Sequence, residues 1–250
     1  MTAAAPSRLI GVSLKMYMDL ARTRDWITAL ADMARTDHPE DVDLFVIPSF
    51  LSIRDVVEAL AGLRVAVGAQ DVFWEDQGAY TGEVSAPMLA QAGCRYVEIG
   101  HAERRRLFGE TDADVRRKVA ASFRAGLVPV LCVGEAAELG PEAAVEACGR
   151  QIAEALEGVA PERDAVIAYE PVWAIGAPRP ASAEHIRAVA GGLRDVLRDR
   201  PNTRVIYGGS AGPGLLGSLG ETVDGLFLGR FAHDIDALKA VLAEASRRHS

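Results

Sequence analysis

The sequence predicts an α/β protein with a single domain over residues 1–250, folded as a (β/α)₈ barrel. Three observations favour this fold. Short apolar segments rich in β-branched residues recur along the chain, and segments with helical periodicity lie between them. The apolar segments are nearly continuous rather than alternating, which is typical of parallel strands covered on both faces. The length of 250 residues could hold two domains, but it suits one barrel, and no second zone of composition is visible.

Eight strands are expected, and each is short and mostly apolar. In chain order they are Arg8–Ser13, Val42–Ile47, Arg64–Ala69, Arg95–Ile99, Val128–Val133, Ala165–Tyr169, Arg204–Tyr207 and Gly225–Leu228. Parallel strands joined through helices form either an open doubly wound sheet or a closed barrel. Eight consecutive strand–helix units within one zone of composition favour the closed barrel.

Helices are expected between the strands, where apolar residues recur every three or four positions. Asp25–Ala34 is the first clear case, with Trp26 and Leu30 on one stripe. Pro141–Leu156 begins with a proline, which is favoured at the first position of a helix. Glu184–Leu197 shows the same helical periodicity.

A long segment, Gln70–Ser85, separates the third strand from the next helix and carries aromatic side chains at Phe73, Trp74 and Tyr80. Loops of this length are uncommon in compact domains unless they have a function. Exposed aromatic patches are typical of protein interfaces. We therefore expect Gln70–Ser85 to contact a partner.

Composition and charge exclude several classes of protein. The formal net charge of -8 argues against a nucleic-acid partner, which requires a basic face. The three cysteines lack a disulfide spacing and fit reduced thiols, and no metal-type cluster with histidine is visible. The chain begins without a basic leader, and no apolar run approaches the roughly 20 residues of a membrane span. We expect a cytoplasmic protein without a metal ion or a membrane partner.

Polar residues follow most of the expected strands, and the active site of a parallel barrel lies at these carboxyl ends. The residues in these positions are Lys15, Gln70, Asp71, His101, Glu135, Glu170, Gly208, Gly209, Ser210, Gly229 and Arg230. Taken singly, Lys15 fits a solvated lysine, His101 a capping histidine and Glu170 an ion-paired carboxylate. Their joint placement at one mouth of the barrel favours an active site instead.

Two glycine-containing turns follow the seventh and eighth strands. Tyr207–Pro213 exposes bare backbone just before a helix that starts with proline. Turns at this place in such barrels commonly bind phosphate through backbone N–H groups. Because many unrelated barrels share this device, it predicts a phosphate ligand and does not specify a reaction.

Five segments carry a resemblance to a known family. They are Gly78–Ser85, Gly100–Arg105, Val130–Glu135, Ala168–Gly176 and Tyr207–Ser210. Together they resemble motifs of the triosephosphate isomerase family, and the resemblance runs from Gly11 to about Leu238. It implies a TIM barrel and a cofactor-independent isomerase of a small ketose or aldose phosphate that works through an enediol.

The resemblance also implies catalytic roles. Glu170 would abstract a proton beside the carbonyl group, His101 would polarise that carbonyl as a neutral imidazole, and Lys15 would balance the developing negative charge. Glu103 would support these residues. Neither a metal ion nor an organic cofactor would be required.

Binding roles follow from the same resemblance. The lid would consist of Pro171, Val172, Trp173, Ala174, Ile175 and Gly176. Substrate and phosphate would be bound by Ser13, Gly176, Ser210, Gly229 and Arg230. The protein would form a homodimer through residues 70–85, with the tip at Tyr80 entering a pocket of the partner.

Four residues depart from the usual family pattern. Ser13 replaces an asparagine, Leu14 a tryptophan, Ala102 a serine and Arg230 a glycine. We expect the first two changes to free volume beside Lys15, enough for one added hydroxymethyl group on the substrate. The substrate hypothesis is therefore L-erythrulose 1-phosphate, converted to D-erythrulose 4-phosphate, as in divergent members similar to isomerases of erythritol or threitol breakdown.

Three alternatives remain open. One is triosephosphate isomerase itself, acting on D-glyceraldehyde 3-phosphate and dihydroxyacetone phosphate. Another is a non-catalytic barrel that binds phosphate, against which the joint retention of Lys15, His101 and Glu170 argues. The last is a phosphate-binding synthase of another barrel family, which would not explain the segment Tyr169–Ala174.

Overall fold

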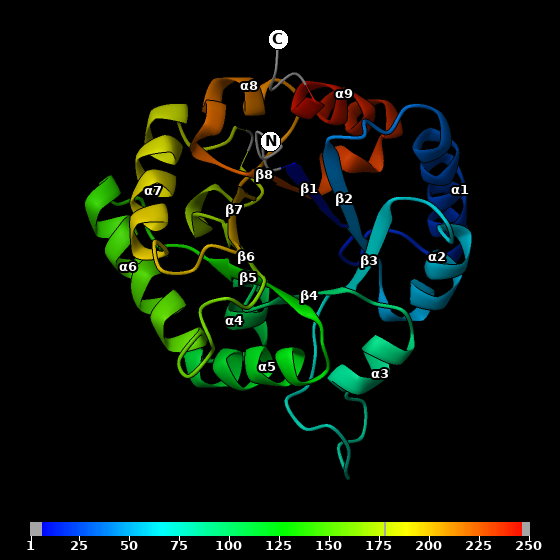
Figure 1. The fold of residues 1–250 in the computed structure, drawn as a ribbon, viewed down its shortest axis with the longest axis horizontal. Helices are drawn as coiled ribbons and strands as arrows, with labels where there is room; N and C mark the ends of the chain where they lie inside the picture. The colour runs from blue at the N-terminus through cyan, green and yellow to red at the C-terminus, as the bar shows by residue number, and fades with distance from the viewer. Residues whose placement is uncertain (1–6, 178, 247–250) are drawn as a thin grey trace, which may run out of the picture.

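The computed structural model describes residues 7–177 and 179–246. In it, eight parallel strands close into a barrel that is surrounded by helices (Figure 1). The strands are β1 (Arg8–Ser13), β2 (Val42–Ile47), β3 (Val65–Ala69), β4 (Tyr96–Ile99), β5 (Val128–Val133), β6 (Ala165–Tyr169), β7 (Thr203–Tyr207) and β8 (Gly225–Leu228). Each strand pairs with the next in sequence, and β8 pairs with β1. The predicted single-domain (β/α)₈ barrel is confirmed, while the predicted limits at 1 and 250 lie outside the described residues.

Helices cover the outside of the barrel. They are α1 (Leu20–Thr36), α2 (Ile53–Ala59), α3 (Ala86–Gln91), α4 (Ala102–Phe108), α5 (Asp112–Arg124), α6 (Pro141–Ala155), α7 (Ala183–Val196), α8 (Leu215–Leu219) and α9 (Ile235–Ser246). Within the described ranges, no helix is long and apolar enough to span a membrane. The three helices predicted from periodicity correspond to α1, α6 and α7.

Alternation along each strand creates two cores. Side chains at every second position point into the barrel, and those between them point toward the helices. The inner core contains Leu9, Phe45, Ile47, Tyr96, Val130, Cys132, Val166, Ala168, Ile206 and Phe227. The larger outer core joins strands to helices and includes Ile10, Val12 and Leu14 of the first strand and its end.

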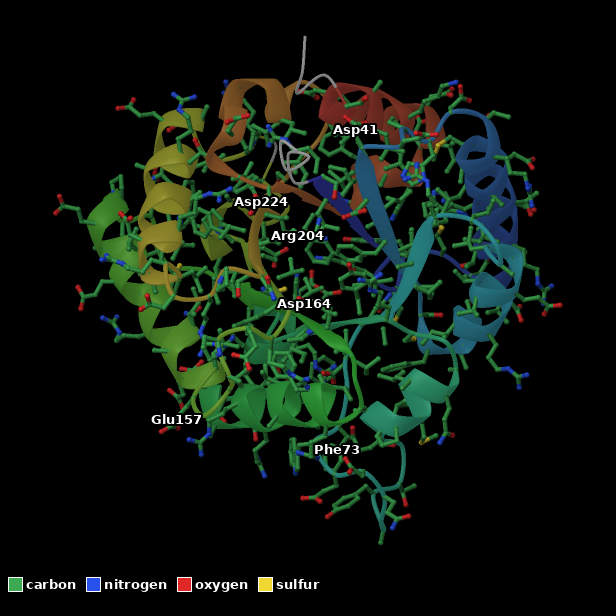
Figure 2. All side chains as sticks on the ribbon, in the orientation of Figure 1. Asp41, Phe73, Glu157, Asp164, Arg204 and Asp224 are labelled. Carbon is green, nitrogen blue, oxygen red and sulfur yellow. The ribbon has the colours of Figure 1, made fainter. Side chains whose placement is uncertain are left out.

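The amino and carboxyl ends of the strands form two different mouths. Asp164, Arg204 and Asp224 lie at the amino ends of β6, β7 and β8 and gather near the barrel axis in Figure 2. Asp224 accepts a hydrogen bond from the backbone N–H of Val205 at 2.7 Å, which ties β7 to the start of β8. The amino mouth therefore carries structural contacts, and the opposite mouth holds the cavity described below.

The segment between β3 and α3 projects from the barrel as a long loop, at the bottom of Figure 1. Phe73 lies near its base (Figure 2) and packs against Trp74 and Tyr80 at ring-centroid distances of 4.1 and 4.7 Å. The loop is therefore held in shape by its own aromatic side chains.

Candidate active site

A cavity of about 730 Å³ opens at the carboxyl ends of the strands. Its lining residues are Ser13, Lys15, Tyr17, Glu98, His101, Ala102, Glu103, Arg106, Glu170, Val172, Ile175, Gly176, Ala177, Gly208, Ser210, Ala211, Phe227, Leu228, Gly229, Arg230 and Phe231. The predicted catalytic and phosphate-binding residues all lie in this one cavity. Within the described part of the chain, no three His, Cys, Asp or Glu side chains are grouped to hold a metal ion.

His101 begins α4 as its N-cap, and its place there fixes its protonation. Nδ1 accepts a hydrogen bond from the backbone N–H of Glu103 at 3.1 Å, which requires an unprotonated Nδ1. A neutral ring then carries its proton on Nε2, which lies 3.4 Å from Oε2 of Glu170. Burial, assisted by the charge of Lys15, lowers the pKa of His101 to about 4. The imidazole is therefore neutral near pH 7 and presents an N–H donor.

Glu170 directly follows β6, and the residue is 5% exposed. Gly208 makes room for it, because a Cβ at that position would lie 2.5 Å from Oε1 of Glu170. Burial, reinforced by the negative charge of Glu98, raises the pKa of Glu170 to about 8. Oε2 forms no hydrogen bond within the described residues. The ionised form is therefore a strong base with a free oxygen.

Lys15 follows β1 in a left-handed backbone conformation, with φ of 49°. Such a conformation is unfavourable for lysine and persists where the surroundings fix it. The Gln70 side chain fixes it here, because Nε2 donates to the Lys15 carbonyl at 2.9 Å. The Lys15 ammonium donates to Glu103 at 2.7 Å. Burial acts to lower the pKa of Lys15, but the Glu103 carboxylate outweighs it and the pKa is raised.

Four residues are predicted to bind phosphate: Gly176, Ser210, Gly229 and Arg230. All four line the cavity, and they follow the neighbouring strands β6, β7 and β8. Ser210 also contacts the lid. Its hydroxyl has two carbonyl oxygens within hydrogen-bond distance, that of Ala174 at 3.0 Å and that of Ala177 at 2.9 Å, and its single proton is donated to one of them at a time. The turn after β7 is therefore directly connected to the lid.

The predicted lid, Pro171–Gly176, divides into two faces. Val172, Ile175 and Gly176 line the cavity. Trp173 points elsewhere, and its indole N–H donates to Glu135 at 2.8 Å. Pro171 and Ala174 are buried and do not line the cavity either. The lid therefore presents an apolar surface to the cavity and is held from behind by a polar contact.

Comparison with known proteins agrees with this geometry. The profile of the triosephosphate isomerase family matches residues 8–245. The chain belongs to that family. It is 50% identical to "L-erythrulose-1-phosphate isomerase" of Pectobacterium atrosepticum, over 94% of this chain and 95% of the relative. It is 42% identical to "Triosephosphate isomerase" of Moorella thermoacetica, over 94% and 97% of the two chains. It is also 42% identical to "L-erythrulose-1-phosphate isomerase" of Mesorhizobium japonicum, over 95% and 96%. The predicted family and the predicted isomerase class are confirmed.

One expectation about this member of the triosephosphate isomerase family is wrong. Leu14 was expected to widen the cavity beside Lys15, but its side chain is 2% exposed and belongs to the outer core. The cause is strand alternation, since Ser13 faces the cavity and its neighbour must face the helices. Of the two changes expected to free volume beside Lys15, only Ser13 therefore lies in the wall of the cavity.

Sequence reasoning also missed Glu98 and Arg106, which both line the cavity. Glu98 lies inside β4 rather than after a strand, so a search of strand ends passes over it. The available signal was an acidic residue inside an otherwise apolar strand. Arg106 lies on the exposed face of α4, where charged side chains are usual and carry no signal of a site.

Proposed function

We propose that this protein interconverts L-erythrulose 1-phosphate and D-erythrulose 4-phosphate. The observation that carries the proposal is the 50% identity, over 94% of the chain, to a relative named L-erythrulose-1-phosphate isomerase. The cavity supports it, because Lys15, His101 and Glu170 converge there and Ser13 leaves room beside them.

The proposed reaction is a proton transfer within one molecule. Glu170 removes the proton from carbon 3 of L-erythrulose 1-phosphate, and the electron pair forms an enediolate across carbons 2 and 3. Nε2–H of His101 hydrogen-bonds the two oxygens in turn and moves a proton between them. Lys15 stabilises the negative charge. Glu170 then returns the proton to carbon 2, so the carbonyl group has moved by one carbon and no external reactant is consumed.

The phosphate and the lid have a second task in this reaction. Backbone N–H groups of Gly176, Ser210 and Gly229 hold the phosphate, and Arg230 adds a cation at the same end. The apolar lid face formed by Val172 and Ile175 excludes water from the enediolate. Neither a metal ion nor an organic cofactor has a step to perform.

We also propose that the working form is a homodimer joined through residues 70–85. Apolar side chains support this, because Met16 is 95% exposed, Phe108 70% and Tyr80 at the loop tip 44%. The tip would enter the partner's pocket near Ser13 and His101. Sedimentation should find a dimer, and deletion of the tip should give a folded monomer with little activity. A fully active monomer would contradict the proposal.

The cytoplasm is the proposed location. Three cysteines support it, because Cys94, Cys132 and Cys148 are all buried and unpaired. Unpaired cysteines are usual in reducing compartments.

Triosephosphate isomerase activity is the second candidate. It is favoured by the 42% identity to the relative of that name from Moorella thermoacetica. The two candidates share Lys15, His101 and Glu170, so these residues do not separate them. The deciding difference is whether the cavity accepts one more hydroxymethyl group.

The test is a comparison of kcat/KM on L-erythrulose 1-phosphate and on D-glyceraldehyde 3-phosphate. We expect the tetrulose phosphate to be preferred by at least about tenfold, because a pocket shaped for the larger substrate loses roughly 10–200-fold on an analogue that lacks one group. Ser13→Asn should narrow the cavity and so reverse this preference. It should lower kcat/KM on the tetrulose phosphate and leave kcat/KM on the triose phosphate unchanged. Efficient turnover of the triose phosphate with none of the tetrulose phosphate would overturn the proposal.

A further inference from the structure

Glu98 is a buried carboxylate in the cavity floor for which the proposed proton transfer has no use. It lies on β4, two positions after Tyr96, and like Tyr96 it points into the barrel. It lines the cavity and is 4% exposed. The Ser13 hydroxyl donates a hydrogen bond to its Oε2 at 2.8 Å. This pair joins β1 and β4 across the floor of the cavity.

The second oxygen of this carboxylate is not used inside the protein. Oε1 lies 4.0 Å from Nε2 of His101, which is beyond hydrogen-bond distance. Within residues 7–177 and 179–246, no lysine or arginine forms an ion pair with Glu98. Oε1 is therefore an acceptor that faces the cavity.

A carboxylate in this position destabilises the empty protein. Removing a charge from water costs several kcal/mol unless ion pairs or hydrogen bonds replace the water. Glu98 has one hydroxyl donor, and burial raises its pKa to about 7 although the Ser13 hydrogen bond opposes the shift. An apolar residue would suit the barrel interior better. A ligand group that hydrogen-bonds Oε1 would account for a carboxylate here.

The place of Glu98 indicates which part of a ligand it meets. The predicted phosphate-binding residues, Gly176, Ser210 and Gly229, lie after β6, β7 and β8, whereas Ser13 and Glu98 belong to β1 and β4. Carbons that react must lie next to Glu170 and His101, between these two ends. A fourth carbon, attached to the reacting carbon on the side away from the phosphate, extends toward Ser13 and Glu98.

We propose that Glu98 is a specificity-determining residue that accepts a hydrogen bond from the terminal hydroxyl group of a tetrulose phosphate. The inference rests on the function proposed above. A triose phosphate has no group to place there and leaves the carboxylate unpaired. Sites built to bind a substrate hydroxyl discriminate strongly against the analogue that lacks it, because their buried polar groups then stay unsatisfied.

The first experiment measures kcat/KM for L-erythrulose 1-phosphate and D-glyceraldehyde 3-phosphate with Glu98→Gln and Glu98→Met. We expect losses on the tetrulose phosphate of about tenfold for Glu98→Gln and about 100-fold for Glu98→Met, with the triose phosphate changed by less than about threefold. Glu98→Met replaces the buried carboxylate with an uncharged side chain of similar volume. Such a replacement is often neutral or stabilising, so this variant is expected to fold. Tyr96→Phe is the control, since it alters the same face of β4 outside the cavity lining.

The second experiment measures binding without turnover. Erythritol 4-phosphate and glycerol 3-phosphate lack a carbonyl group and differ by one hydroxymethyl group, so calorimetry compares their dissociation constants directly. The unmodified protein should prefer the four-carbon ligand by about tenfold or more, and both variants should lose this preference.

The outcomes separate the two proposals. An unmodified protein without any four-carbon preference in either experiment overturns the proposed function and this inference with it. If the preference exists but survives in both Glu98 variants, only the role of Glu98 is wrong. Equal losses on both substrates would likewise overturn the inference, because they would make Glu98 a general positioning residue.

Discussion

Glu98→Gln should change the way in which the stability of the protein depends on pH. Burial raises the pKa of Glu98 from 4.5 to about 7, so the folded protein holds a proton there that the unfolded chain releases. Stability falls with rising pH wherever the folded state binds more protons. The contribution of Glu98 is therefore fully present below pH ~4.5 and is lost as the pH rises through about 7.

The size of the effect follows from that shift. As the pH rises from about 5 to 8, the proton that the folded protein keeps on Glu98 is lost, and the free energy of unfolding should fall by roughly 2–3 kcal/mol. Glutamine does not titrate, so Glu98→Gln should lack this loss. Other groups also titrate, because the raised pKa of Glu170 acts in the same direction and the lowered pKa of His101 in the opposite one. The informative quantity is the difference between the variant and the unmodified protein.

Urea unfolding at several pH values measures this difference, and an exposed glutamate provides the control. Glu154 lies on the solvent side of α6, so Glu154→Gln should track the unmodified protein at every pH. Glu98→Gln should gain about 2–3 kcal/mol relative to the unmodified protein as the pH rises from about 5 to 8. A difference that is constant with pH would refute the reasoning, because Glu98 would then titrate as it does in the unfolded chain.

Three further predictions concern turnover. Glu170→Asp should fold normally and lose about 10²-fold or more in kcat, because it draws the base back from the reacting carbon by ~1 Å; near-normal turnover would remove Glu170 from the role of base. His101→Gln should lower kcat by roughly 10²–10³-fold with a smaller change in KM; a change in KM alone would make His101 a binding residue. Arg230→Gly should raise KM roughly tenfold and leave kcat unaltered, and steady-state kinetics with an unchanged KM would show that its guanidinium does not contact the phosphate.

The strands were predictable because a parallel barrel buries them on both faces. All eight predicted segments match the structure to within one residue, and the differences occur where a predicted strand began with an arginine. β3 begins at Val65 and β4 at Tyr96, one residue after Arg64 and Arg95, whereas β7 begins at Thr203, one residue before Arg204. The Arg64 guanidinium instead donates to the carbonyl of Glu40 at 2.8 Å. A continuous apolar run therefore predicts where a strand lies more accurately than it predicts the residue at which the strand begins.

Helices were predicted less completely, for two physical reasons. α2, α3 and α8 have seven, six and five residues, which is too short for a 3.6-residue period to be read. α1 begins at Leu20, five residues before the predicted Asp25, because the side chain of Asp19 accepts a hydrogen bond from the N–H of Arg22 and caps the helix. Asp19 is the sequence signal for this start, and apolar periodicity alone does not register it.

The candidate site was predictable where it follows from topology. Lys15, His101 and Glu170 come one or two residues after strands, and a closed barrel brings all carboxyl ends to one mouth. Their protonation was not predictable, because it depends on burial and on the Nδ1 contact of His101. The error at Leu14 was avoidable, since the inward direction of Ser13 already sends the next side chain outward.

The charges of the cavity explain how an acidic protein could bind a phosphate dianion. Glu98, Glu103 and Glu170 line the same cavity as Lys15 and Arg230, so with all groups ionised the carboxylates would oppose the ligand. Two features reduce that opposition. Glu103 is neutralised locally by its 2.7 Å contact with Lys15, and the raised pKa values of Glu98 and Glu170 let both hold protons close to neutral pH. Since Glu98 and Glu170 repel each other when both are ionised, a proton retained on Glu98 eases ionisation of Glu170, the form that the proposed base requires.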